Sequence, residues 1–204
     1  MSDTWLPEPP AGTQVCLGFD GSETGDFTAI KGRTLDGLLF TPRWLERPTI
    51  WDPADHGGRM PRNEVDAAVD ALFDRFDVAR MYCDPPLWGT EIERWALRHG
   101  DRRVVKWETY RAVPMHTELE RFVVDVSAGR LRHDGCPITT AHVRNARMAH
   151  RRDSRYVLSK PHDLSRKIDA AMASVLAHAA ACDAEAAGWG QDSGDDLPDL
   201  VFGL

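Results

Sequence analysis

The sequence lacks any long apolar run. Nowhere in its 204 residues does an apolar stretch approach the roughly 20 residues that a membrane-spanning helix needs. Residues 1–7 contain no basic region leading into an apolar core, which is the pattern of a secretory signal. We therefore expect a protein that does not span a membrane and has no evident export signal.

Cysteine is scarce, and its spacing is irregular. Cys16, Cys83, Cys136 and Cys182 are far apart and show none of the paired spacings typical of zinc or redox motifs. Two of them lie in apolar, strand-like runs. The pattern predicts reduced, mostly buried thiols in a cytosolic setting.

An unusual composition is also absent. With 42% hydrophobic and 28% charged residues, the chain is typical of a folded globular protein and not of wholesale disorder. Its length suits one well-buried domain with short appendages. We expect an extended, proline-containing lead-in or linker at residues 1–13, a folded domain at 14–185 and an acidic C-terminal tail at 186–204.

Positive charge is missing from the end of the chain and concentrated just before it. The net charge is −7, yet residues 142–167 hold eight Lys and Arg residues against Asp153 and Asp163, whereas residues 183–204 hold six acids and no Lys or Arg. Such a basic segment suits a phosphate-binding surface, although a solvated face is the commoner explanation. Its members are Arg144, Arg147, Arg151, Arg152, Arg155, Lys160, Arg166 and Lys167.

The order of apolar patterns predicts an α/β fold with a mixed sheet. Three strand-like runs at residues 15–20, 27–30 and 37–40 form a meander, separated by turns at Gly21–Gly25 and Asp36–Gly37. A helix capped by Asn63, a strand at 78–84, a helix at 89–99 and a strand at 104–107 then favour parallel neighbours. Further helices are expected at 115–127, 139–148 and 164–185, with an extended segment at 156–158.

Three acids lie at positions where an unpaired carboxylate is unfavourable or where a metal ligand could be placed. Asp20 ends the first strand, Asp84 ends a later strand before Pro85, and Asp169 lies at the edge of the apolar face of the last helix. A carboxylate on a central strand needs a partner or a cation. The alternatives are a turn-opening role for Asp20 and a favourable helix-dipole interaction for Asp169.

Together these acids could bind two divalent ions. Such a pair needs several oxygen donors, and it hydrolyses a phosphodiester without a Ser, Cys or His nucleophile. Secondary-structure inference cannot show that the three acids converge.

Four short motifs resemble the C-terminal nuclease domain of the large terminase subunit of tailed bacteriophages, which has a ribonuclease-H-like fold. They are residues 18–22 with 26–29, residues 82–85, residues 133–135 with 142–146, and residues 166–171. The resemblance implies a mixed sheet with helices on both faces. It also implies an endonuclease that cuts concatemeric viral DNA, with Asp20, Asp84 and Asp169 binding two Mg²⁺ or Mn²⁺ ions.

The same resemblance suggests supporting residues and partners. Asp26, His133 and Asn145 are secondary candidates for the site, and the basic segment is the candidate DNA contact. Implied partners are double-stranded DNA, an ATPase domain or subunit, the small terminase subunit and the portal, in the cytoplasm of an infected bacterial host.

One feature of whole large terminases is missing, and other interpretations remain open. Nothing matches the phosphate-binding loop Gly-x-x-x-x-Gly-Lys-Ser/Thr, so this chain alone is not expected to be the packaging motor. Whether it is an excised domain or a separate polypeptide is left open. Rival interpretations are a catalytically silent DNA-gripping or portal-docking domain, a resolvase- or integrase-type nuclease, and an actin-like nucleotide-binding fold, for which the chain is short.

Overall fold

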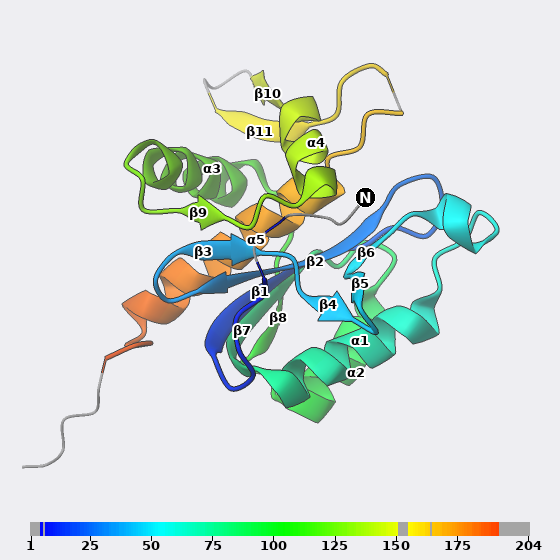
Figure 1. The fold of residues 1–204 in the computed structure, drawn as a ribbon. Coiled ribbons are helices and arrows are strands. Elements are labelled where there is room, and N and C mark those ends of the chain that lie inside the picture. Colours follow the sequence, from blue (N-terminus) through cyan, green and yellow to red (C-terminus); the bar gives the residue numbers. More distant parts are fainter. Residues whose placement is uncertain (1–4, 6, 151–154, 164, 192–204) are drawn as a thin grey trace, which may run out of the picture.

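A computed structural model describes residues 5, 7–150, 155–163 and 165–191. Its centre is a seven-stranded mixed sheet in the order β8-β7-β1-β2-β3-β9, with β6 also pairing with β2 (Figure 1). The strands are β1 (Gln14–Asp20), β2 (Thr28–Thr34), β3 (Leu38–Phe40), β6 (Ile50–Trp51), β7 (Asp77–Cys83), β8 (Val104–Lys106) and β9 (Arg132–His133).

The strand directions agree with the predicted meander and crossovers. β1, β2 and β3 are successively antiparallel, whereas β7 runs parallel to both β1 and β8. Each parallel pair is joined through a helix, α1 between β1 and β7 and α2 between β7 and β8, as a parallel connection requires. The fold class is therefore confirmed as a mixed α/β sheet.

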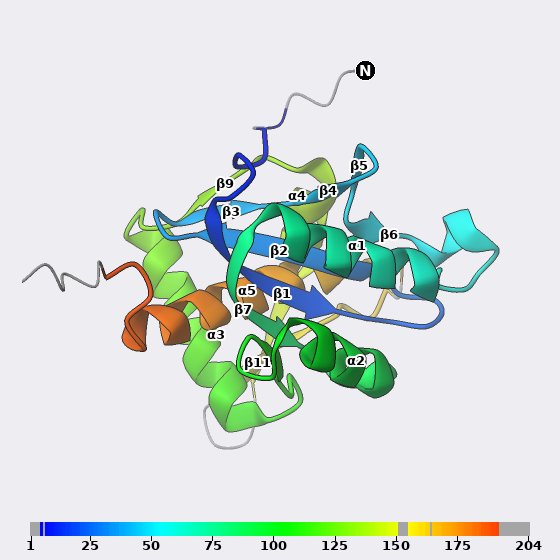
Figure 2. The same cartoon turned by 90° about the horizontal axis from the view of Figure 1, so that it is seen from below.

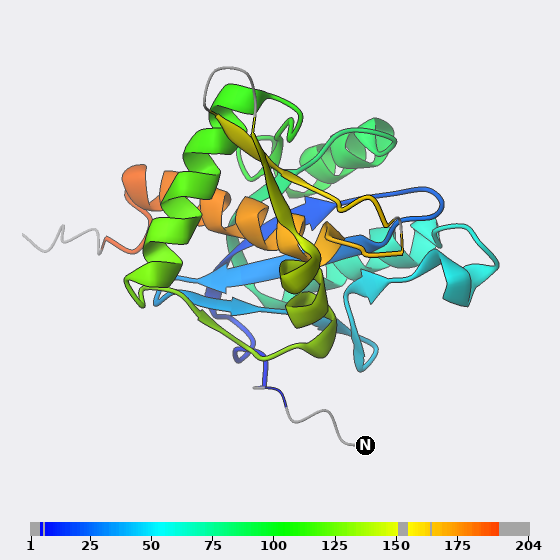
Figure 3. The ribbon, with the colours of Figure 1, turned by 90° about the horizontal axis from the view of Figure 1, so that it is seen from above.

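Helices cover both faces of the sheet. Figure 2 shows α1 (Arg62–Arg75) and α2 (Gly89–His99) on one face, and Figure 3 shows α5 (Asp169–Ala186) and α3 (Ala112–Ser127) on the other. α4 (Pro137–Asn145) packs against α5. Two small hairpins, β4 (Arg43–Trp44) with β5 (Arg47–Pro48) and β10 (Arg147–His150) with β11 (Tyr156–Ser159), and a 3₁₀ turn, η1 (Pro53–His56), complete the fold.

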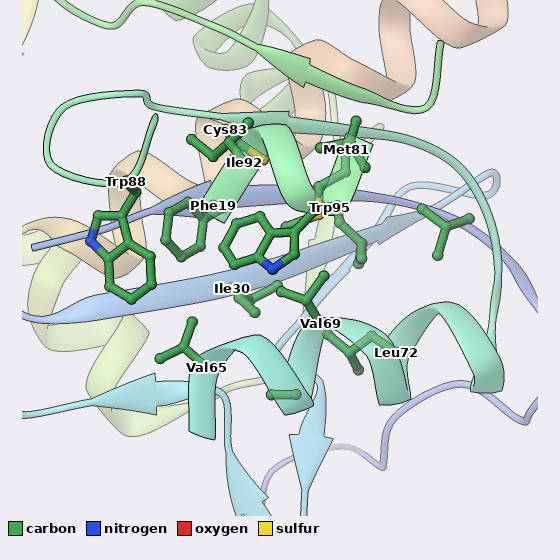
Figure 4. Close-up of a cluster of buried hydrophobic side chains, with 14 of the residues drawn as sticks. Phe19, Ile30, Val65, Val69, Leu72, Met81, Cys83, Trp88, Ile92 and Trp95 are labelled. Carbon is green, nitrogen blue, oxygen red and sulfur yellow. The ribbon is translucent and has the colours of Figure 1, made fainter. Parts of the chain in front are cut away.

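The alternation of side chains along β1 separates the two hydrophobic cores. Leu17 and Phe19 point toward α1 and α2, where Phe19 packs edge-on against Trp88 and Trp95 (Figure 4). Cys16, on the opposite face, belongs to the core beneath α5. Because successive strand residues point to opposite faces, Gly18 and Asp20 share the α5 face with Cys16.

An alanine-rich helix packs unusually close to the strand. α5 presents Ala173 and Ala177 to β1, and a Cβ atom on Gly18 would lie 2.2 Å from the Ala173 oxygen and 2.3 Å from the Ala177 nitrogen. Real Cβ atoms do not approach that closely, so the packing depends on glycine at this position. Gly18 thus sets the height of α5 above the sheet.

Several predicted boundaries are wrong. The helix predicted at 139–148 ends at Asn145, because Arg147–His150 instead pair with Tyr156–Ser159 as a hairpin, and the Arg147 guanidinium binds the terminal helix carbonyls of Arg144 and Ala146. The last helix begins at Asp169 and not at 164, because Asp163 accepts from the Ser165 backbone and hydroxyl in a local turn.

Other differences are smaller. Asn63 lies inside α1, whose N-cap is Pro61, and Asp84 follows β7 instead of ending it. Between β3 and α1 the chain also forms β4, β5, β6 and η1, for which the sequence pattern predicts no elements. The expected free thiols are confirmed, with Cys16, Cys83 and Cys136 buried and Cys182 half-buried. No helix of the described residues is long and apolar enough to cross a bilayer.

The described part of the lead-in contacts the domain. Glu8 forms an ion pair with Arg75 at 3.0 Å and accepts from the Arg43 backbone, and Gly12 donates to the Arg75 carbonyl. The predicted division at residue 13 stays a prediction, as does the tail at 186–204, of which residues 192–204 lie outside the described residues.

Candidate functional site

A cavity of about 330 Å³ opens at the end of β1. Its wall combines acids, one lysine and apolar side chains drawn from segments far apart in the chain. The lining residues are Asp20, Gly21, Ser22, Asp26, Leu87, Leu158, Ser159, Lys160, Ile168, Asp169 and Met172. Two of the three predicted metal ligands therefore share one cavity.

Strand pairing places the third acid beside the first. β1 and β7 run parallel with Phe19 opposite Cys83, and the Asp84 backbone N–H donates to the Phe19 carbonyl at 3.0 Å. Asp20 and Asp84 each come one residue after this matched pair. Two carboxylates consequently lie at the same edge of adjacent strands.

The packing of α5 on β1 places Asp169 near the same edge of the sheet. Ala173 lies against Gly18, and Asp169 is one helical turn before Ala173 on the same helix face, while Asp20 is two residues after Gly18 on the same strand face. Asp169 is only 5% exposed, and its Oδ2 is buried without a hydrogen-bond partner. An unpartnered buried carboxylate oxygen is costly, so it fits a cation ligand.

Thr109 holds the Asp84 carboxylate in place. The Thr109 backbone N–H donates to Oδ1 at 3.1 Å, and its hydroxyl donates to Oδ2 at 2.8 Å. These bonds favour the charged carboxylate and lower its pKa, but the larger effect of burial leaves the pKa above its usual range. The orientation of Asp84 is therefore fixed before any ligand binds.

The remaining acids carry repulsion that a cation would relieve. Burial, followed by the negative charges of Asp169 and Asp84, raises the pKa of Asp20 well above the ordinary 3.8. Burial also raises the pKa of Asp169, and the positive charge of Lys160 partly offsets this. Like charges in a poorly solvated place favour either protonation or a bound metal ion.

Asp26 is held by two lysines at the rim of the cavity. Lys160 binds its Oδ2, and Lys167 approaches its Oδ1 at 3.0 Å while also donating to the Gly25 carbonyl. Despite partial burial, the hydrogen bonds and charges of both lysines lower the pKa of Asp26. Asn145 supports this arrangement because its amide donates to the Lys167 carbonyl at 3.0 Å.

The three acids are not the most compact group of potential metal ligands in the described residues. Within the described part of the chain, the one group of three potential ligand atoms lying within 4.8 Å of one another is formed by Asp125, His178 and Cys182. Asp20, Asp84 and Asp169 offer no three ligand atoms within that distance of one another.

Comparison with solved structures identifies the architecture. The large terminase nuclease of thermophilic phage G20c with bound magnesium matches with a TM-score of 0.60 and 15% identity, over 86% of this chain and 91% of that one. The Thermus phage P74-26 large terminase nuclease domain matches with a TM-score of 0.61 and 14% identity, over 85% and 88%. The HK97 bacteriophage large terminase gives 0.60 and 16%, over 85% of this chain and 40% of that one.

This chain has the terminase-nuclease fold. The ribonuclease-H-like fold predicted from the four motifs is thereby confirmed. In sequence, the chain is 36% identical to the Gene 13 protein of Mycobacterium phage D29 and 35% identical to that of phage L5, over 180 residues in each case. It spans 29% of the length of these two relatives. No family model matches the chain.

Within the terminase-nuclease fold, members of the basic segment lie in different settings. Lys160 and Lys167 pair with Asp26 at the cavity, whereas Arg147 binds carbonyls at the end of α4. Arg166 pairs with Asp163 at 3.4 Å. Arg144 is exposed and Arg155 half-buried, and Arg151 and Arg152 lie outside the described residues.

His133 is not brought to the cavity. It lies exposed on β9 at the edge of the sheet, where its Nδ1 accepts from the Gly135 backbone at 3.1 Å. It lines a second cavity of about 360 Å³ between β3, β9 and α4. The structure therefore provides no contact between His133 and the three predicted metal ligands.

Sequence reasoning missed Thr109 and underrated Lys160. Thr109 follows β8, which is the parallel neighbour of β7. Its position after that strand indicates that it lies at the same edge of the sheet as Asp84. Lys160 was assigned to DNA contact as one of many basic residues. Only the packing of the segment after β11 shows that it reaches the acids.

Proposed function

We propose that this chain is a metal-dependent DNA endonuclease that cuts concatemeric viral DNA during genome packaging. The observation that carries the proposal is the meeting of Asp20, Asp84 and Asp169 at one edge of the sheet, with a buried oxygen of Asp169 left unpartnered. The match to terminase nucleases supports it, since the nuclease of phage G20c is described with bound magnesium in one solved structure and with bound cobalt in another.

In this proposal the three aspartates hold two Mg²⁺ or Mn²⁺ ions. When bound, such ions lower the pKa of an attacking water and stabilise the leaving oxygen of a phosphodiester. Thr109 keeps both oxygens of Asp84 oriented. Leu158, Ile168 and Met172 belong to the apolar part of the wall, which limits the water around the acids and strengthens their electrostatic interactions.

Lys160 supplies positive charge at the cavity. Its ammonium group binds Asp26 and also offsets the charges of Asp20 and Asp169. Once cations neutralise Asp20 and Asp169, the positive charge of this lysine would also attract a phosphate oxygen of the DNA backbone. Lys167 keeps Asp26 in position from the other side.

The proposed substrate is double-stranded DNA contacted mainly through its backbone. The basic segment from Arg144 to Lys167 offers phosphate contacts, which carry no sequence information directly. Cleavage should therefore be largely independent of sequence and sensitive to salt. Sharp site specificity of the isolated chain would contradict this mode of binding.

The partners and setting belong to the same proposal. Because the chain spans 29% of its curated phage relatives, we assign the cutting step to it and the packaging motor to an ATPase domain or subunit. The small terminase subunit and the portal would provide site selection and docking, in the cytoplasm of the infected bacterial host.

Incubation of supercoiled plasmid with the purified chain tests the proposal. Nicked or linear DNA should form with Mg²⁺ or Mn²⁺ and not with a chelator. Asp20→Asn, Asp84→Asn and Asp169→Asn should each abolish cleavage while retaining the fold, and Asp101→Asn, at an exposed position outside the cavity, should cleave normally.

Two outcomes would contradict the proposal. Cleavage that persists in chelator would exclude a metal-dependent reaction. Salt-sensitive DNA binding without any cleavage would instead indicate the silent DNA-gripping domain. A variant that loses activity only by unfolding would not support the assignment of its carboxylate.

A further inference from the structure

A second group of metal-ligating side chains lies where α3 crosses α5. Asp125 comes from α3, and His178 and Cys182 come from successive turns of α5. Figure 3 shows the two helices crossing on the same face of the sheet. His178 Nε2 lies 3.0 Å from Asp125 Oδ2 and 3.5 Å from Cys182 Sγ.

The ring nitrogen Nε2 is the centre of this group. His178 is 0% exposed, and Phe122 packs edge-on against its ring at 5.4 Å. Asp125 and Cys182 are half-buried, so solvent can reach the group from their side. The residue spacing of four places His178 and Cys182 on one helix face.

The two distances from His178 Nε2 are close to those expected around a tetrahedral zinc ion. With zinc bonds of about 2.0–2.1 Å to nitrogen and oxygen and about 2.3 Å to sulfur, tetrahedral geometry separates nitrogen from sulfur by roughly 3.5 Å and nitrogen from oxygen by roughly 3.3 Å. The observed nitrogen–sulfur and nitrogen–oxygen separations are 3.5 and 3.0 Å, so the side chains would need to move only slightly to bind the ion.

A cysteine-histidine-aspartate catalytic triad fits less well. In such a triad the base uses one ring nitrogen for the thiol and the other for the carboxylate. Here the carboxylate contact and the shorter thiol contact both involve Nε2, and Nδ1 is 3.9 Å from the sulfur. Convergence of a nitrogen, a sulfur and an oxygen on one point is instead typical of a zinc site.

We propose that Asp125, His178 and Cys182 bind one Zn²⁺ ion, with the fourth position open to water. The Cys182 thiol releases its proton to solvent on binding. The single ring proton of neutral His178 moves to Nδ1, so that the Nε2 lone pair faces the ion. Arg130 binds Oδ1 of Asp125 at 2.5 and 2.7 Å, which leaves Oδ2 for the metal.

Nearby charges are compatible with this site. Burial raises the pKa of the Cys182 thiol, and the positive charges of Arg33 and Arg121 partly offset this effect. Both are themselves paired, Arg33 with Glu185 at 2.7 Å and Arg121 with Glu118 at 3.3 Å. Their repulsion of a cation is therefore reduced.

The proposed zinc site is separate from the aspartate site. Cys182 comes thirteen residues after Asp169 in the same helix, which at 1.5 Å per residue is roughly 20 Å along the axis. An ion there would fasten α3 to the helix that carries Asp169. Its role would be to brace the fold and not to cut DNA.

Titration of the full 204-residue chain with Co²⁺, a spectroscopic substitute for zinc, tests the proposal. Cobalt bound by a thiolate gives a near-ultraviolet sulfur-to-metal charge-transfer absorption that carboxylate ligands do not produce. The wild type should develop this absorption as cobalt is added, and Zn²⁺ should remove it. Cys182→Ser should lose it, and Asp20→Asn and the matched thiol control Cys136→Ala should retain it.

Each result decides the matter. Absence of the absorption in the folded wild type would overturn the proposal without any variant. Its persistence in Cys182→Ser would place the thiolate ligand elsewhere and would also overturn it. Near-ultraviolet circular dichroism checks that Cys182→Ser is folded, and Asp125→Asn, which keeps the thiol, should retain the absorption but require more than tenfold higher cobalt.

Discussion

The backbone of Gly18 in β1 lies so close to Ala173 in α5 that a Cβ atom on Gly18 would be 2.2 Å from the Ala173 oxygen. This contact joins the strand that ends in Asp20 to the helix that begins with Asp169. The separation of the two acids therefore depends on the absence of a side chain two residues before one of them. The packing of Gly18 against Ala173 therefore helps to position Asp169, which lies one helical turn before Ala173.

Gly18→Ala should destabilise the protein by about 1–3 kcal/mol or more, because an extra methyl group has no space and α5 must move. Urea unfolding measures the change in midpoint. Gly89→Ala is the matched control, since nothing lies within 4 Å of a Cβ at that position and alanine favours the start of α2. Equal midpoints for Gly18→Ala and wild type would contradict the packing argument.

Without metal, Asp20→Asn should stabilise the protein near neutral pH. The folded pKa of Asp20 is raised above its unfolded value, so the folded state binds more protons between the two pKa values. The free energy of unfolding therefore falls as the pH rises through that interval. Above the folded pKa the destabilisation caused by the charged Asp20 carboxylate is fully present.

The urea midpoint, measured in chelator at about pH 5 and about pH 7, checks this sign. The wild type should lose more stability on going to the higher pH than Asp20→Asn does. Comparison with the variant cancels the contributions of the titratable groups that both proteins share. If the urea midpoints of the two proteins had the same pH dependence, the pKa of Asp20 would not be raised in the folded state.

Thr109→Val should reduce cleavage by about 10–100-fold, the usual cost of losing a residue that orients a metal ligand. The variant lacks the hydroxyl that donates to Asp84 Oδ2 at 2.8 Å, but it keeps the backbone bond to Oδ1. The concentration of Mg²⁺ needed for half-maximal cleavage should rise. Thr109→Ser retains the hydroxyl and should stay near wild-type activity; equal losses in both variants would argue for a merely structural role.

Lys160→Met should weaken duplex DNA binding at all sequences and flatten the log–log salt dependence by about 0.9, the value for one phosphate contact. Fluorescence anisotropy at several salt concentrations, with Ca²⁺ in place of a catalytic metal, provides the measurement. Arg102→Met, exposed at the other end of the β7 and β8 strands, should leave the slope unchanged. An unchanged slope for Lys160→Met would move the DNA path away from the cavity.

The double variant Arg151→Ala/Arg152→Ala tests the rest of the basic segment. If both side chains contact the DNA backbone, the salt slope should flatten by up to about two units while metal binding at the acids is unchanged. If the pair lies on a solvated face, affinity and slope should match the wild type. These two residues lie outside the described part of the chain, so this prediction rests on sequence alone.

Local pattern was enough to predict most elements. The end of β1 at Asp20, the whole of α2 and the strand before Asp84 follow from apolar periodicity and from Gly and Pro punctuation. Boundaries failed where tertiary contacts compete with helix propensity. Arg147 illustrates this, because hairpin pairing with Ser159 removed it from the predicted helix.

The sequence by itself determined the mixed α/β order, the free thiols and the identity of the candidate acids, because these depend on residue type and short-range spacing. Only the tertiary structure decided that the acids share an edge, that Thr109 and Lys160 reach them, and that His133 does not. The same applies to Asp125, His178 and Cys182, whose grouping depends on the crossing of α3 and α5. Contacts between distant residues arise from strand register and helix packing, and the glycine at position 18 permits the close packing of α5 on β1.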